Sequence, residues 1–126
     1  MKNLFYLALV VVLIGCCKAV LKPGQINIYG NETTSGDSLM SINFEDNDFG
    51  IAQDTTFLGL LSTETSISLS VLTGDSFILY IPGSTSEYKI NFVEIDYRGR
   101  CAQKIKSLKY NLNGTQTESE IITISN

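Results

Sequence analysis

Histidine, the side chain that most often moves protons near neutral pH, does not occur in this sequence of 126 residues. Its absence excludes most hydrolase triads and most zinc sites, which depend on an imidazole. Cys101 would act as a nucleophile only if Lys104 or Arg100 lowered its pKa. A small buried side chain in a strand is the simpler explanation for this cysteine. We therefore expect no enzymatic activity, no catalytic residue and no cofactor.

The densest acidic cluster comprises Glu45, Asp46 and Asp48, with Asp54 shortly after. Calcium prefers several oxygen ligands from one flexible loop, so these four carboxylates are the candidate metal site. Their spacing does not match an EF-hand, because Phe49 occupies a position where that loop needs a ligand. The alternative is a solvated loop between strands in which the short acidic side chains form Asx turns.

Four basic residues, Arg98, Arg100, Lys104 and Lys106, lie around one predicted hairpin in a chain whose formal net charge is −4. They are a candidate anion patch for a sulfated or phosphorylated sugar, or for the acidic surface of a partner protein. The alternative is that lysines on an edge strand prevent pairing between sheets. The acidic balance disfavours nucleic acid as a partner, and it also argues against attraction of the domain to anionic lipid headgroups.

Two further sets of residues have both a functional and a structural explanation. The first set is four tyrosines: Tyr80, Tyr88, Tyr97 and Tyr110. If exposed, they could stack on sugar rings; the alternative is that they are half-buried at the rim of the core. Asn31 with Thr33, and Asn113 with Thr115, form acceptor triplets for N-glycosylation, which only a eukaryotic source would use.

The N-terminus has the layout of an export signal. Lys2 precedes an apolar run over residues 4–14, and Lys18 ends this run well short of the about 20 residues that a spanning helix needs. Within this leader, Leu13, Ile14, Gly15 and Cys16 follow one another and resemble the lipobox of bacterial lipoproteins.

The resemblance implies that residues 1–15 are a signal peptide and that acyl chains on Cys16 anchor the protein in a membrane. Because Cys17 and not an aspartate follows Cys16, the resemblance favours the outer membrane. If Cys16 is lipidated, Cys17 and Cys101 are the two remaining thiols, and an oxidising compartment favours a disulfide between them, although the tether would have to fold back. The alternatives are a secretory signal cut after Ala19 and an uncleaved anchor.

After a short tether over residues 16–24, the hydrophobic pattern takes a period of two, which is typical of half-buried strands. Residues 76–81 are apolar at nearly every position and indicate a strand that is covered on both faces, or on one face plus a loop. The candidate strands are residues 26–28, 39–44, 57–61, 67–72, 76–81, 88–97, 102–112 and 118–125. Residues 25–126 are therefore predicted to form one all-β domain, an antiparallel β-sandwich of immunoglobulin-like architecture with about seven strands; a small β-barrel is the alternative.

The C-terminal strands carry the clearest turn signal. Asn113 followed by Gly114 predicts a two-residue type I′ hairpin turn. This turn would place Ile105 opposite Ile122, so that the last three strands form a meander. The apolar positions change face partway along, which predicts a β-bulge within residues 105–108.

Together these patterns predict a small membrane-anchored lipoprotein of the cell envelope whose β domain is a non-catalytic structural or binding module. Its expected partners are the membrane, through the acyl chains on Cys16, and another envelope protein or a polysaccharide. The alternative is a secreted ligand-binding or calcium-dependent adhesive domain that uses the loop over residues 45–54.

Overall fold

The computed structural model describes residues 22–99 and 104–125, which contain nine β-strands and no helix. The prediction of an all-β domain is therefore confirmed. The strands are β1 (Gly24–Gly30), β2 (Ser38–Phe44), β3 (Ala52–Leu60), β4 (Ile67–Val71), β5 (Phe77–Tyr80), β6 (Glu87–Arg98), β7 (Lys104–Leu112), β8 (Thr115–Thr117) and β9 (Ile121–Ile124). The first of them begins at Gly24, the last residue that the sequence pattern assigns to the tether. This part of the chain holds no helix that could cross a membrane.

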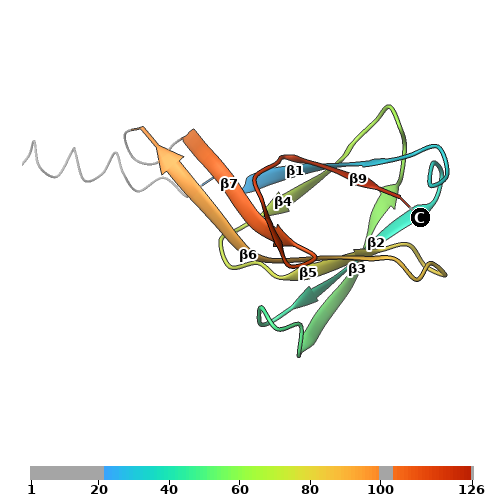
Figure 1. The fold of residues 1–126 in the computed structure, drawn as a ribbon, viewed down its shortest axis with the longest axis horizontal. Coiled ribbons are helices and arrows are strands. Elements are labelled where there is room, and N and C mark those ends of the chain that lie inside the picture. The colour runs from blue at the N-terminus through green and yellow to red at the C-terminus, as the bar shows by residue number, and fades with distance from the viewer. Residues whose placement is uncertain (1–21, 100–103, 126) are drawn as a thin grey trace, which may run out of the picture.

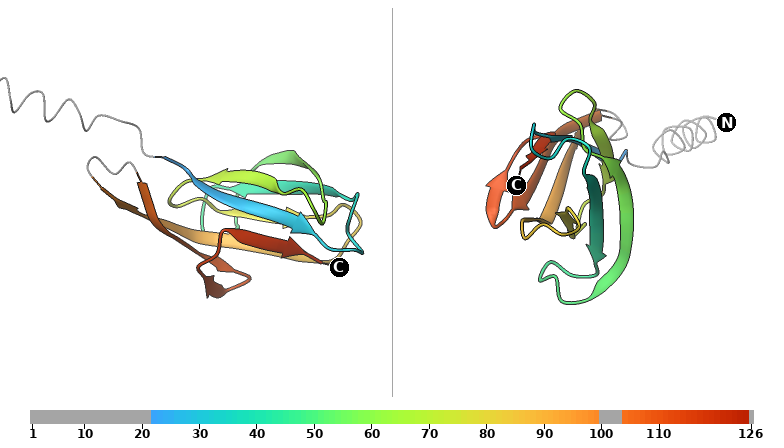
Figure 2. Two further views of the ribbon diagram at one scale, coloured as in Figure 1. Left: turned by 90° about the horizontal axis from the view of Figure 1, so that it is seen from above. Right: turned by 90° about the vertical axis from the view of Figure 1, so that its right-hand side faces the viewer.

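The strands form two open sheets in a sandwich-like arrangement (Figure 1, Figure 2). The small sheet has the order β4-β1-β9, and the large sheet has the order β3-β2-β5-β6-β7-β8. Neighbouring strands are antiparallel, except that β1 and β9 run parallel. Neither sheet closes on itself, so the architecture is not the barrel considered as an alternative.

The core lies between the sheets and is built from alternate residues of the strands. In β1, Ile26 and Ile28 are fully buried while Gln25 is exposed. β5 departs from this alternation because Phe77, Ile78 and Leu79 are all buried, as expected of a strand covered on both faces or on one face plus a loop.

The turn between β7 and β8 is of the predicted kind. Asn113 has φ 50° and Gly114 has φ 83°, the two positive values that a type I′ turn needs. The predicted meander, however, is wrong. β8 ends at Thr117, and Ile122 pairs with Ile28 of β1 in the small sheet rather than with Ile105. The physical reason is burial, since β9 beside β1 places Ile122 in the core at 4 % exposure.

Two β-bulges bend the long hairpin of β6 and β7. Asp96 pairs with Ser107 and Tyr97 pairs with Ile105, so Lys106 is an extra residue on β7. This bulge lies within the predicted residues 105–108 and confirms that expectation. The second bulge lies on β6 at Phe92, which has φ 51°.

Candidate ligand-binding site

A polar cavity of about 270 Å³ opens between the two sheets. It lies where β2 and β3 of the large sheet face β4 of the small sheet, and the turn between β4 and β5 completes it. Its lining residues are Ser41, Asn43, Phe44, Gln53, Thr56, Leu58, Leu69, Ser70, Asp75, Ser76 and Phe77. β3 and β4 are both the outermost strands of their sheets, so the cavity occupies an open side of the sandwich.

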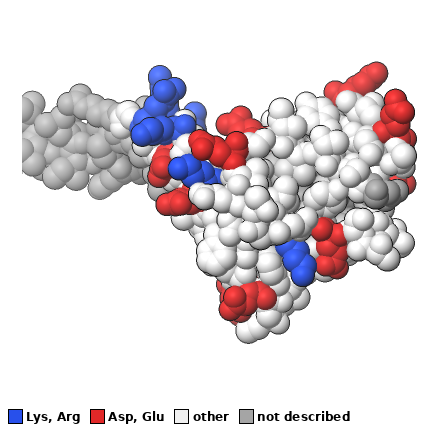
Figure 3. All heavy atoms as spheres, in the orientation of Figure 1, with Lys and Arg blue, Asp and Glu red and all other residues white. Residues whose placement is uncertain are grey.

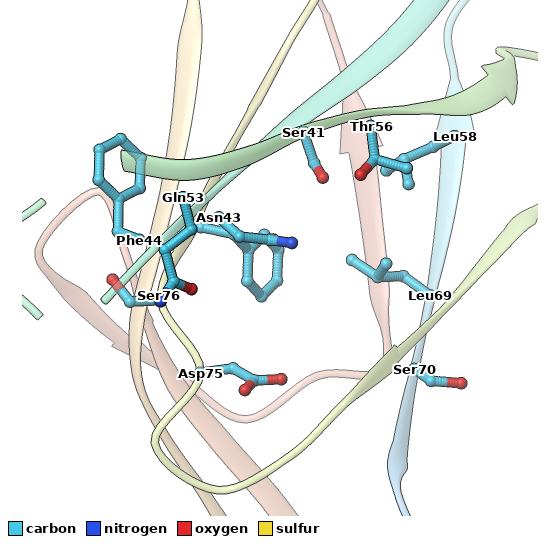
Figure 4. A pocket seen from close by; sticks show the side chains of 11 residues that line it. Ser41, Asn43, Phe44, Gln53, Thr56, Leu58, Leu69, Ser70, Asp75 and Ser76 are labelled. Carbon is cyan, nitrogen blue, oxygen red and sulfur yellow. The ribbon is translucent and has the colours of Figure 1, made fainter. Parts of the chain in front are cut away.

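Opposite walls of this cavity carry different polar groups (Figure 4). The hydroxyl groups of Ser41 and Thr56 come from β2 and β3, and the carboxylate of Asp75 lies on the other side. Asp75 Oδ2 accepts a hydrogen bond from the Leu72 amide at 2.7 Å, so a turn holds this carboxylate in place. Ser76 Oγ is buried in the cavity lining without a hydrogen-bond partner within the described part of the chain.

The lining combines hydroxyl, amide and carboxylate groups with apolar faces from Leu58, Leu69 and Phe77. Such a surface suits a small ligand that has many hydroxyl groups and an apolar side, because each polar group can donate to or accept from a ligand hydroxyl. The volume is just below the about 300–1,000 Å³ of typical ligand pockets, so one unit of a larger molecule is the appropriate scale.

The cavity was not predicted from the sequence, although Ser41 at a core-facing position of β2 is one signal for it. Ser41 follows Leu39 at the same inward-facing parity of β2, and both residues are buried. A small polar residue at a core-facing position of a strand marks a place where the core stops being apolar. The contribution of the turn after β4 could not be read from any local pattern.

The acidic loop is held by its own hydrogen bonds. Asp46 Oδ1 accepts from the Gly50 amide at 2.9 Å, and the Glu45 amide donates to the Ile51 carbonyl at 3.0 Å. Asn47 fastens the loop to the bulge of β6 by accepting from the Phe92 amide at 3.2 Å. Only the Asp46 bond is a local one from a short acidic side chain to the backbone, and it fits the alternative of a loop held by its own acidic residues.

The predicted calcium ligands are not brought together. Glu45, Asp46 and Asp48 are exposed in the loop, and Asp54 is exposed on β3. Across residues 22–99 and 104–125, no group of three or more carboxylate or cysteine side chains is arranged to hold a metal ion.

Three of the four predicted anion-patch residues are described, and all three are exposed. Arg98 and Lys104 are direct cross-strand partners at the end of the β6–β7 hairpin, and Lys106 is the bulged residue nearby. Arg100 lies outside the described residues, as do Cys16, Cys17 and Cys101, so the lipidation site, the disulfide and the nucleophile remain predictions.

Two of the four tyrosines have structural roles, Tyr110 inside the core and Tyr88 packed against it. Tyr110 is 1 % exposed and donates to the Ser119 carbonyl at 2.8 Å, and its burial raises the pKa of the phenol. Tyr88 bonds to the Ser125 carbonyl at 3.0 Å. These bonds favour the structural explanation over sugar stacking for both side chains.

Both glycosylation triplets lie in turns. Asn31 Oδ1 accepts from the Thr33 and Thr34 amides, each at 3.0 Å, and Asn113 Oδ1 accepts from the Lys89 amide at 2.8 Å. No protein-family model, no curated protein and no solved structure matches this chain, so the arguments about its function rest on the residues described above.

Proposed function

We propose that this protein is a membrane-anchored, non-catalytic binding module of the cell envelope. In this proposal Cys16 holds the chain at the membrane, and the β-sandwich presents its open side to a polysaccharide. The observation that carries the binding role is the polar cavity between β2, β3 and β4. Its mixture of hydroxyl, amide and apolar surface is the chemistry that a sugar unit needs.

Anchoring is supported by the lipobox resemblance of residues 13–16 and by the short distance along the chain between Cys16 and the start of β1 at Gly24. The mature protein should carry acyl chains on Cys16, which mass spectrometry of its N-terminal peptide would detect. Cys16→Ser should move the protein from the detergent phase to the aqueous phase, whereas Cys17→Ser should leave it in the detergent phase. A native product that begins at Val20 without acyl chains would contradict the anchor and favour secretion.

Binding can be tested by two-dimensional NMR titration with a panel of neutral oligosaccharides. We expect the largest shifts at Ser41, Thr56 and Asp75, which line the cavity. Thr56→Val removes one hydroxyl from the wall and should weaken binding about fivefold, in line with one lost hydrogen bond. Thr55→Val makes the same chemical change at an exposed neighbour that does not line the cavity. Equal effects of the two substitutions would refute the cavity as the binding site.

We also propose that the sandwich is immunoglobulin-like in its connections. The supporting feature is that β2 and β5 are hydrogen-bonded neighbours although β3 and β4 lie between them in the chain. Connections of this Greek-key kind are common in such sandwiches. An experimental structure compared with immunoglobulin domains strand by strand tests this relation.

A further inference from the structure

The first described residues of the chain lie at the end of the molecule where β6 ends and β7 begins. Tyr97 of β6 donates a hydrogen bond to the Lys22 carbonyl at 2.6 Å, two residues before β1 begins. Figure 1 shows the start of β1 and the tips of β6 and β7 on the same side. Under the proposed anchoring, this end of the domain faces the membrane.

Basic side chains gather at this same end. Lys22, Arg98, Lys104 and Lys106 are all exposed, and Figure 3 shows Lys and Arg atoms gathered at one end of the domain, with Asp and Glu atoms among them. The structure describes two other lysines, Lys89 and Lys109, and they lie elsewhere. Lys89 Nζ is 5.9 Å from the centre of the Phe49 ring. Lys109 lies opposite Glu94 in the register of β7 with β6. The basic end is therefore distinct within a chain that is acidic as a whole.

The neighbouring acidic residues do not neutralise the basic end. Asp96 lies on β6, two residues before Arg98, and accepts a hydrogen bond from Ser107 Oγ of β7 at 3.2 Å. Asp75 lies in the turn after β4, whose last residue pairs with Gly24. Glu94, two residues before Asp96 on β6, is a third exposed carboxylate. Four positive charges thus stand against three negative ones, and no basic side chain in residues 22–99 or 104–125 forms an ion pair.

Arg98 and Lys104 lie directly opposite each other, an arrangement that destabilises a sheet through repulsion of like charges. An anionic surface outside the protein would offset this repulsion. At physiological salt the screening length is about 8 Å, so acidic residues on the remote parts of the domain have little effect here. The net charge of the chain is therefore a poor guide to what this end attracts.

We propose that Lys22, Arg98, Lys104 and Lys106 form a basic end that binds the headgroups of anionic phospholipids. This inference rests on the proposed membrane anchoring for the orientation of the domain, but the binding itself needs no acyl chain. Each basic residue near an anionic membrane strengthens binding about fivefold, so the basic end and an acyl anchor would act as two membrane signals.

A different explanation of the same lysines is protection of a strand edge. β7 pairs with β8 only over residues 110–112, so its residues 104–109 have no partner strand on that edge among residues 22–99 and 104–125. Lysines on such an edge prevent pairing between molecules. This explanation does not account for Arg98 on β6, and it predicts self-association when the charges are removed.

The test uses a chain that begins at Lys22, because every residue of the described core lies between Ile26 and Ile124. Vesicles of neutral phosphatidylcholine are compared with vesicles that contain about a third phosphatidylglycerol, at low and high salt. We expect binding to the anionic vesicles alone and its loss at high salt. The double variant Arg98→Gln, Lys104→Gln should bind about 25-fold more weakly.

The control variant Lys89→Gln, Lys109→Gln removes the same charge elsewhere and should bind as the parent does. The melting temperature of the Arg98→Gln, Lys104→Gln variant should equal or exceed that of the parent, because a repulsive pair is gone. No binding to anionic vesicles at low salt, or an equal loss in the control, would overturn the inference. Unchanged vesicle binding together with self-association of the first variant would overturn it in favour of edge protection. Acylation of Cys16 is measured separately, so a failed anchor and a failed basic end give different results.

Discussion

Thr34 joins two distant parts of the chain through one buried hydroxyl. The residue is fully buried, its Oγ1 accepts from the Asn31 amide at 2.8 Å, and the same hydroxyl donates to the Ile124 carbonyl at 2.9 Å. Thr34→Val keeps the shape of the side chain and removes both bonds. The difference in the free energy of unfolding between Thr34→Val and the parent protein therefore measures the contribution of this hydroxyl.

The substitution leaves two backbone groups without the hydroxyl, the Asn31 amide and the Ile124 carbonyl. A buried polar group without its partner costs about 1–3 kcal/mol, so we expect a total loss of about 3 kcal/mol after partial relaxation. For a domain of this size, 1 kcal/mol corresponds to about 4–8 °C in melting temperature. The melting temperature should therefore fall by about 12–24 °C.

Urea and thermal unfolding monitored by circular dichroism measure this loss. Thr34→Ser keeps the hydroxyl and should recover most of the stability. Thr33→Val is the matched control, because Thr33 is an exposed neighbour whose hydroxyl bonds to Asn31 Oδ1 at 2.7 Å. If Thr34→Val lowered stability no more than Thr33→Val, the argument about buried unsatisfied groups would fail here.

Three further predictions concern other positions. Because burial raises the pKa of Tyr110 in the folded protein, its contribution is complete below the usual tyrosine pKa of about 10 and is lost as pH rises above it. Alkaline unfolding monitored by circular dichroism should therefore begin at higher pH in Tyr110→Phe, although this variant loses the bond to Ser119 and should be less stable at pH 7 by about 1 kcal/mol. Gly30→Ala would place a Cβ 2.8 Å from the Leu61 Cβ, so urea unfolding should show a loss of about 1–3 kcal/mol. Gly114→Ala has open space but φ 83°, and thermal unfolding should show a loss of about 1 kcal/mol from backbone strain alone.

Features decided by neighbouring residues could be predicted from the sequence. The type I′ turn follows from the residue pair Asn113 and Gly114, and the bulge at Lys106 follows from a change in the facing of apolar positions. The buried β5 follows from its unbroken apolar run. Each of these signals lies within a few residues of the feature that it predicts.

Features decided by distant contacts could not be predicted. Nothing local shows that Ile122 pairs with Ile28, because 94 residues separate them and the burial that β1 offers to Ile122 exists only in the folded sandwich. The cavity also depends on distant parts of the chain, because Thr56 and Asp75 come to line the same space only after the two sheets have packed. The polar residues are visible in the sequence, but no local pattern predicts that Thr56 and Asp75 face the same cavity.

The parallel pairing of β1 with β9 has a consequence for how the molecule is made. β1 is the central strand of its sheet, and one of its two partners starts only at Ile121, five residues before the C-terminus. The small sheet therefore cannot be completed until β9 has been synthesised, after all of β2 to β8. Until β9 has been synthesised, β1 lacks one of its two neighbours, and the small sheet can consist of β1 and β4 alone.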